Sequence, residues 1–262
     1  MGVINVTPDS FSDGGDFSKN ATKPYEVDIS KVLYRVESYV KDGVSIVDIG
    51  GESTRPGATS VAVDIELHRT IPVIQAVKKN LDIPLSIDTS SPIVMAEAIS
   101  AGVDIINDVR ALSVPGAIDV ALNSKVAVCL MHMMGNPRSM QNTPQYSDVV
   151  SEVTEFLRER IAACKQVGDI ENRLLVDPGF GFGKTVSHNY QLLKSLSSFQ
   201  DLGFPLLVGI SRKSMIGEVV NRPVKERIYG TIAATILAIS NGASVIRTHD
   251  VAATMDAIRV HC

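Results

Sequence analysis

The sequence lacks the cysteine patterns of a disulfide-bonded or zinc-binding protein. It has three cysteines in 262 residues (Cys129, Cys164 and Cys262), and they form no CxxC pair. A disulfide framework is therefore excluded, and we expect a reducing compartment. No leader pattern is visible at the N-terminus, and no apolar run is long enough to span a membrane. These absences predict a cytoplasmic protein with no membrane partner.

The sequence also lacks an excess of basic residues. Its 25 Lys and Arg residues are outnumbered by 29 Asp and Glu residues, which gives a net charge of −4. No overall positive field attracts nucleic acid, so we expect no nucleic-acid partner. An anionic substrate would have to be bound by a local cluster of basic residues. The hydrophobic share of 45% is ordinary for a chain that folds around one large core.

Sequence repeats and linkers rich in Pro, Gly and Ser are missing as well, but one structural rhythm is present. Short apolar runs rich in Val, Ile and Leu alternate with longer amphipathic segments. Continuous apolar runs are typical of strands that are buried on both faces, as in a parallel sheet. The eight predicted strands cover residues 2–6, 45–49, 85–88, 103–107, 126–131, 174–177, 206–210 and 244–248.

The segments between these runs have apolar residues spaced near 3.6, which predicts helices. The predicted helices cover residues 28–41, 63–79, 92–101, 117–123, 148–167, 186–196, 225–241 and 252–261. Gly43, Gly102 and Gly242 follow three of them and suit the left-handed end of a helix. Eight strand–helix units without a linker predict one α/β domain over residues 1–262, a (β/α)8 TIM barrel with mobile loops at its C-terminal face. A doubly wound open sheet is the alternative.

Nearly every predicted strand ends in a polar residue suited to chemistry, and in a barrel the strand ends form the active face. A single Asp after a strand can equally be a helix cap or a turn former. Convergence from eight strands is harder to explain by caps, and it predicts a ring-shaped polar site. The residues at these ends are Asn5, Asp48, Asp88, Asn107, His132, Asp177, the segment 211–214 and the segment 247–249.

These residues also sort by the ligand that they suit. Asp88, Asn107 and Asp177 provide acceptors and an amide for a flat heterocycle rich in N–H groups, and Lys213 can donate to the same ring. A second set suits phosphate oxygens and a metal, because arginine binds two oxygens at once and a neutral amide oxygen suits Mg²⁺. That set is Arg55, Arg247 and His249 for the phosphates and Asn5 for Mg²⁺. Structural salt bridges are the alternative role for the two arginines, and simple packing is the role that we favour for the Met131 side chain.

Two glycine-rich segments need separate interpretation. The segment 179–185, GFGFGKT, resembles a phosphate loop, but the first glycine of that pattern falls on Pro178 and the match fails. We interpret it as a flexible wall of the site, and the segment 50–57 as a second mobile loop with a charged tip. His68 and His188 lack ligand-spaced partners, so we interpret both as surface or structural residues.

The motifs together resemble those of the dihydropteroate synthases, and the resemblance covers essentially the whole chain. The segments 5–15 (NVTPDSFSDGG) and 48–57 (DIGGESTRPG) are similar to the family's first two signatures and are highly specific. Less specific matches, shared with related pterin-binding barrels, follow in order. They lie at 86–89 (SIDT), 106–108 (IND), 130–133 (LMHM), 177–184 (DPGFGFGK), 211–214 (SRKS) and 247–250 (RTHD).

The resemblance implies a transferase of folate biosynthesis and a sulfonamide target. It would condense 6-hydroxymethyl-7,8-dihydropterin pyrophosphate with p-aminobenzoate, assisted by Mg²⁺, to give 7,8-dihydropteroate and pyrophosphate. By position, the pterin would be held by Asp88, Asn107, Asp177 and Lys213, and Met131 and Gly209 are further substrate-binding residues. The pyrophosphate and its metal would be held by Asn5, Arg55, Arg247 and His249. p-Aminobenzoate would be bordered by Thr54, Pro56, Phe182 and Ser214, with Asp9 and Phe11 closing from the first loop.

The chemistry agrees with these roles. Loss of pyrophosphate from a methylene on an electron-rich ring leaves positive charge on carbon and negative charge on the leaving group. Asp9 or Asp88 can stabilise the first charge, and Arg55 and Lys213 are further catalytic candidates. The rival functions are a methyltransferase acting on methyltetrahydrofolate and a non-catalytic pterin-binding protein. Family resemblance further implies a homodimer through the late helices, and the sequence is equally compatible with fusion to another folate-pathway domain.

Overall fold

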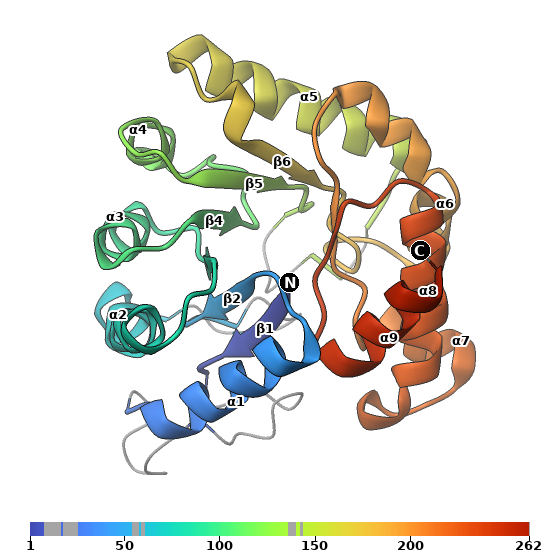
Figure 1. Cartoon of the computed structure of the whole chain (residues 1–262). Helices are drawn as coiled ribbons and strands as arrows, with labels where there is room; N and C mark the ends of the chain where they lie inside the picture. The colour runs from blue at the N-terminus through green and yellow to red at the C-terminus, as the bar shows by residue number, and fades with distance from the viewer. Residues whose placement is uncertain are drawn as a thin grey trace.

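The computed structural model describes residues 1–7, 17, 26–53, 58, 61–135, 140–141 and 144–261. Eight parallel strands form the centre of the molecule. Figure 1 shows helices around the outside of the strands. The strands are β1 (Gly2–Asn5), β2 (Val47–Gly50), β3 (Leu85–Asp88), β4 (Ile105–Asp108), β5 (Ala127–Met131), β6 (Leu174–Asp177), β7 (Leu207–Val208) and β8 (Val245–Ile246). All eight predicted strands are present, and the structure shortens the last two.

The strands close into a barrel through two bridges. β1 to β6 pair in sequence order, and β7 pairs with β8. Val176 of β6 bridges to Leu206 beside β7, and Gly2 of β1 bridges to Thr248 beyond β8. Two backbone hydrogen bonds make the second junction, from Val3 N–H to the Thr248 carbonyl and from Thr248 N–H to the Met1 carbonyl, both at 3.0 Å. The sheet is therefore a closed (β/α)8 barrel and not an open doubly wound sheet.

The helices cover the outside of the barrel. They are α1 (Ile29–Asp42), α2 (Val63–Asn80), α3 (Pro92–Ala101), α4 (Ala117–Leu122), α5 (Val149–Val167), α6 (Val186–Lys194), α7 (Ser214–Val220), α8 (Ile228–Ser240) and α9 (Val251–His261). The prediction missed one of these, the short helix α7, which lies between β7 and α8. No helix in the described part of the chain is long and apolar enough to cross a membrane.

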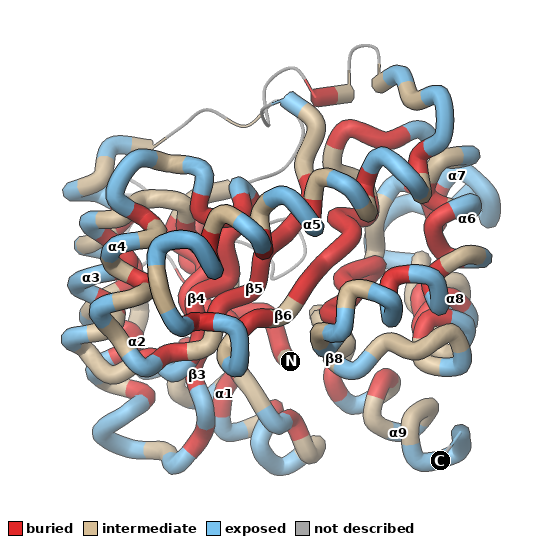
Figure 2. Tube along the Cα trace, turned by 90° about the horizontal axis from the view of Figure 1, so that it is seen from above, coloured by how far each residue is buried: buried red, intermediate tan, exposed pale blue. Residues whose placement is uncertain are grey.

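Local sequence explains where these elements begin and end. Asp28, Ser91 and Asp148 cap α1, α3 and α5 by accepting hydrogen bonds from backbone N–H groups of the first turn. Gly43 and Gly102 end α1 and α3 in the left-handed conformation, with φ of 94° and 103°, as predicted. The strands and inner helix faces are buried while the outer helix faces are exposed, as Figure 2 shows. Most of the interior is therefore apolar, and the strand ends contribute buried polar side chains to it.

Candidate active site at the carboxyl ends of the strands

Strand register brings the predicted site residues to one level of the barrel. Asn5 pairs with Gly50, Gly50 with Asp88, and Asp88 with Asn107. Further around the barrel, Met131 pairs with Asp177. Because residues two apart on a strand share a face, Asp48 lies on the same side of β2 as Gly50. The side chains of neighbouring strand ends therefore point into one shared space.

Asp48, Asp88, Asn107 and Arg247 form a linked group that we call the acidic wall. Arg247 Nε lies 2.6 Å from Asp48 Oδ2, and its Nη2 lies 2.9 Å from Asp88 Oδ2. Asn107 Nδ2 donates to the same Asp48 oxygen at 3.3 Å. The ion-pair role considered for Arg247 is thus present, and its guanidinium joins the last strand end to the second and third.

The acidic wall keeps three buried oxygens without a hydrogen-bond partner among the described residues. They are Oδ1 of Asp48, Oδ1 of Asp88 and Oδ1 of Asn107. Leaving a buried acceptor unpaired costs about 1–3 kcal/mol, so native proteins rarely tolerate three together. Such a cluster at a barrel mouth indicates a ligand that brings several N–H donors.

Charge at the site is tuned by burial. Burial raises the pKa of Asp88 to about 7, and Arg247 opposes the shift while Asp48 adds to it. Burial also raises the pKa of Asp177, against the attraction of Lys213. The pKa of Lys213 falls to about 8 for the same reason, with Asp177 opposing. Asp88 and Lys213 can therefore change protonation state near neutral pH as a ligand binds.

Lys213 and Phe182 contact each other on the side of the site that lies opposite the acidic wall. The Lys213 ammonium lies 4.7 Å from the centre of the Phe182 ring and donates to the Phe180 carbonyl. A Cβ built at Gly209 would lie 3.9 Å from Lys213 Nζ and 3.7 Å from Arg247 Cβ. Gly209 therefore lies beside the Lys213 ammonium and the aliphatic part of Arg247.

Residues 178–184, which we call the glycine loop, are packed against their neighbours, which corrects the expectation of a flexible segment at 179–185. Lys184 is buried and donates to His132 Nδ1 at 2.8 Å, to the Gly179 carbonyl at 2.9 Å and to the Phe182 carbonyl at 3.0 Å. Gly179 has φ of 70°, and a Cβ there would lie 1.8 Å from the His132 carbonyl oxygen. The lysine of the phosphate-loop-like segment therefore points inward and supports the loop.

Burial lowers the pKa of His132 to about 2, with the Lys184 ammonium adding to the shift, so the ring is neutral and accepts from Lys184. His188 also has a structural role, as predicted, because it completes a capping box with Thr185 at the start of α6. Both histidines serve the frame around the site.

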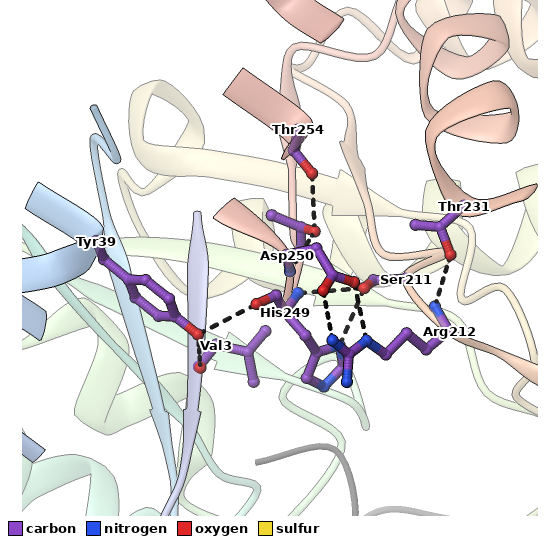
Figure 3. A network of polar contacts seen from close by, with 9 residues as sticks. Val3, Tyr39, Ser211, Arg212, Thr231, His249, Asp250 and Thr254 are labelled. Carbon is purple, nitrogen blue, oxygen red and sulfur yellow. Dashed lines mark hydrogen bonds and ion pairs between the residues drawn. The ribbon is translucent and has the colours of Figure 1, made fainter. Parts of the chain in front are cut away.

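The loops after β7 and β8 are joined by polar contacts, which Figure 3 shows from close by. Ser211 Oγ lies 3.1 Å from both the backbone nitrogen and Nδ1 of His249. Arg212 Nε donates to Asp250 Oδ2 at 2.8 Å, and its second nitrogen forms an ion pair with the same carboxylate. These contacts fix the phosphate candidate His249 beside the segment that carries Lys213.

The predicted site residues thus fall into two groups. The structure brings together the acidic wall, Asp177, Lys213, Gly209 and Phe182. Met131 is buried, and its side chain lies next to Gly179. Ser214 is exposed at the start of α7. Asn5 lies at the same level of the barrel as Gly50, and a Cβ built on Gly50 would lie 3.2 Å from Asn5 Oδ1. Five predicted residues lie outside the described part of the chain. They are Asp9, Phe11, Thr54, Arg55 and Pro56.

Three residues had no assigned role in the sequence interpretation and have one here. Asp48 was noted as a strand end, and its complete burial with two partners marks it as part of the site. Lys184 and Ser211 lie within matched motifs, but their partners are distant in sequence.

Comparisons with known proteins agree with this geometry. Residues 1–249 match the family model described as pterin binding enzyme. The chain is 47% identical over 260 residues to a dihydropteroate synthase of Haemophilus influenzae, covering 99% of this chain and 91% of that protein. It is 48% identical to that of Escherichia coli strain K12, covering 99% and 89%.

Solved structures are similar over the whole chain. A Yersinia pestis dihydropteroate synthase with a sulfonamide drug complex has a TM-score of 0.93 at 43% identity, covering 100% of this chain and 91% of that one. A Xanthomonas albilineans dihydropteroate synthase with 4-aminobenzoic acid has a TM-score of 0.89 at 47% identity, covering 99% and 90%. A structure from the same organism in complex with 7,8-dihydropteroate has a TM-score of 0.85 at 44% identity, also covering 99% and 90%.

Proposed function

We infer that this chain, which belongs to the pterin-binding enzymes and within them to the dihydropteroate synthases, condenses 6-hydroxymethyl-7,8-dihydropterin pyrophosphate with p-aminobenzoate. The products are 7,8-dihydropteroate and pyrophosphate. The observation that carries the proposal is the set of three unpartnered buried oxygens of the acidic wall at the mouth of the barrel. A reduced pterin brings the N–H donors that such oxygens lack.

The pterin is proposed to bind between the acidic wall and Lys213. Asp88, Asn107 and Asp177 would accept from its amino and ring N–H groups, and Lys213 would donate to a ring acceptor. Gly209 leaves space for the ring between Lys213 and Arg247. Because both carboxylates are buried, these hydrogen bonds replace water completely and orient the methylene that reacts.

The reaction is proposed to proceed by loss of pyrophosphate as the amine of p-aminobenzoate attacks the methylene carbon. The bond from this carbon to the pyrophosphate oxygen breaks, the new C–N bond forms, and the amine releases a proton. Arg55, Arg247 and His249 would stabilise the leaving pyrophosphate, and Asp9 or Asp88 the positive charge on the pterin. Thr54, Pro56, Phe182 and Ser214 would border p-aminobenzoate.

We propose that Mg²⁺ is bound through the pyrophosphate rather than by a protein cage. No group of three His, Cys, Asp or Glu residues suited to a metal occurs in the described part of the chain. Asn5 provides a neutral amide oxygen at the end of β1, which fits an ion that keeps several waters and takes few protein ligands. The metal would supply charge neutralisation to the leaving group.

We also propose a cytoplasmic homodimer. Cys129 and Cys164 are buried free thiols, which fits a reducing compartment. Large apolar side chains are exposed on the late helices, with Tyr229 86% and Leu237 53% exposed on α8. These two residues lie two turns apart on one helix face, which suits an isologous contact between two copies. Light scattering on Leu237→Glu should then show a monomer where the unchanged chain shows a dimer.

Release of pyrophosphate tests the proposed function. Incubation with the pterin pyrophosphate and p-aminobenzoate should release pyrophosphate and form dihydropteroate in equal amounts, and omission of p-aminobenzoate should abolish both. Lys213→Met should be inactive, and Lys165→Met, which changes an exposed lysine on α5, should be fully active. Pterin binding without turnover would favour a binding protein, and methyl transfer from methyltetrahydrofolate would favour the rival enzyme.

A further inference from the structure

Ser211 and His249 contact each other across the gap between two loops. Ser211 follows β7 and is buried, whereas His249 follows β8 and is half-buried. The serine hydroxyl oxygen lies 3.1 Å from the backbone nitrogen of His249 and 3.1 Å from its Nδ1 (Figure 3). One hydroxyl group thus contacts both the main chain and the ring of the same histidine.

The hydrogen bonds at this contact indicate which nitrogen of the His249 ring carries the proton. The backbone N–H of His249 can only donate, so it occupies a lone pair of Ser211 Oγ. The hydroxyl proton then needs an acceptor, and Nδ1 is the acceptor that the described residues place within reach. If Nδ1 carried the proton instead, the buried serine O–H would have no acceptor among the described residues, which is unfavourable. Nδ1 is therefore the acceptor, and the proton of the neutral ring lies on Nε2.

Surrounding contacts hold both residues in place. Arg212 N–H donates to Thr231 Oγ1 at 3.1 Å, and the Arg212–Asp250 ion pair joins the residues that follow Ser211 and His249. Asp250 N–H donates to Thr248 Oγ1 at 3.1 Å. The Tyr39 hydroxyl lies 3.3 Å from the His249 carbonyl oxygen (Figure 3). The distance between Ser211 and the ring is therefore set by the backbone of both loops.

We propose that Ser211 is a positioning residue that holds neutral His249 as the Nε2–H tautomer, so that the ring donates a hydrogen bond to the pyrophosphate group. This inference rests on the proposed function, which assigns His249 to the pyrophosphate. A ring with its proton on Nδ1 would present a lone pair of Nε2 to anionic oxygens and repel them. Ser211 thus favours the Nε2–H tautomer, which is the neutral form of the ring that can donate to an anion.

The tautomer itself is measured by NMR on protein labelled with ¹⁵N-histidine. Ring nitrogens that carry a proton differ clearly in shift from those that do not, and His249→Gln identifies the His249 signals among the five histidines. The unchanged protein should show Nε2–H for His249 above the ring pKa, and Ser211→Ala should show a mixture of both tautomers. A proton on Nδ1 in the unchanged protein overturns the proposal, whether or not Ser211→Ala folds.

Binding of inorganic pyrophosphate in the presence of Mg²⁺, measured by calorimetry, gives the second readout. Ser211→Ala should weaken binding at least fivefold, and Ser211→Thr, which keeps the hydroxyl, should restore it to within twofold. Ser198→Ala is the matched control, because this exposed serine in the 3-10 helix 196–202 donates its hydroxyl to the Ser195 carbonyl. Equal affinity in Ser211→Ala and the unchanged protein overturns the positioning role. Failure of the unchanged protein to bind pyrophosphate overturns the proposed function, and it leaves the tautomer measurement intact.

Discussion

The acidic wall and the glycine loop lie on opposite sides of the same site and satisfy their polar groups in opposite ways. The wall leaves Oδ1 of Asp48, Asp88 and Asn107 without partners among the described residues. In the glycine loop, Lys184 has three acceptors, and Asn189 accepts from Gly181 N–H at 2.7 Å. The difference teaches which polar groups bind ligand and which build the frame. Substitutions in the wall should cost function, and those around the loop should cost stability.

Lys184→Met should give the largest effect and should fall on stability. The change leaves His132 Nδ1 and the partly buried Phe182 carbonyl unpaired, whereas the Gly179 carbonyl keeps the Phe182 N–H at 3.1 Å, so the free energy of unfolding should fall by about 4 kcal/mol. Urea unfolding measures it. Asn107→Ala, in the acidic wall, removes an unpartnered buried oxygen and should change the same quantity by less than about 1 kcal/mol. If both substitutions destabilise equally, the distinction between the two sides of the site is wrong.

Glu66→Gln should change how stability depends on pH. Burial raises the pKa of Glu66 from 4.5 to about 7, against the side-chain hydrogen bond from Thr89 and the charge of Arg69, while Glu52 adds to the shift. Because the folded pKa is raised, the stabilising contribution is present below pH 4.5 and is lost as pH rises through 7. Unfolding free energies across this window should therefore fall by about 3 kcal/mol, and the substitution should flatten the curve. An unchanged slope in Glu66→Gln would contradict the assignment.

Asp177→Asn should cost ligand binding and leave the fold intact. One oxygen of Asp177 accepts from Gly179 N–H at 2.7 Å, and an asparagine oxygen can keep that bond. The amide then turns a donor toward the donors of the pterin, which should weaken pterin binding at least about tenfold. Calorimetry with the unphosphorylated pterin measures the change. Unchanged affinity would remove Asp177 from the site.

The smallest expected effect concerns the order of binding. The segments 7–23 and 51–60 carry Asp9, Phe11, Thr54, Arg55 and Pro56, and we expect them to close on bound pyrophosphate. Mg²⁺ with pyrophosphate should then tighten binding of p-aminobenzoate and of sulfonamides at least about fivefold, with an equal effect in reverse. Titration of p-aminobenzoate with and without Mg²⁺-pyrophosphate is the test. Equal dissociation constants would mean that its pocket is preformed.

Sequence was sufficient for the barrel and for the residue types at its mouth, because both depend on local patterns. Apolar runs locate the strands, and the parallel arrangement then puts Asp88, Asn107 and Asp177 at one level. Pairings within the site were not predictable, since Arg247 meets Asp48 and Asp88 from 199 and 159 residues away. Helix α7 escaped prediction because its seven residues are too few to show a periodic pattern.

The inward orientation of the Lys184 side chain was also not predictable from a local sequence pattern. It depends on three glycines with positive φ at 179, 181 and 183, which let the backbone fold around the ammonium group. At Gly183, a Cβ would lie 2.7 Å from the Met134 carbonyl oxygen, so the loop packs against a segment that no local pattern connects to it. A glycine-rich motif thus looks flexible in sequence and is tightly packed in the structure.

The junction that closes the barrel has a consequence for biosynthesis. The Val3 N–H donates to the Thr248 carbonyl, so β1 can pair on this edge only after residue 248 has been synthesised. At typical translation rates this takes on the order of 10 to 50 seconds, during which one edge of β1 has no β8 to pair with. Open strand edges are templates for pairing with other chains. A chaperone that covers nascent strand edges would therefore protect β1 for longer than any later strand.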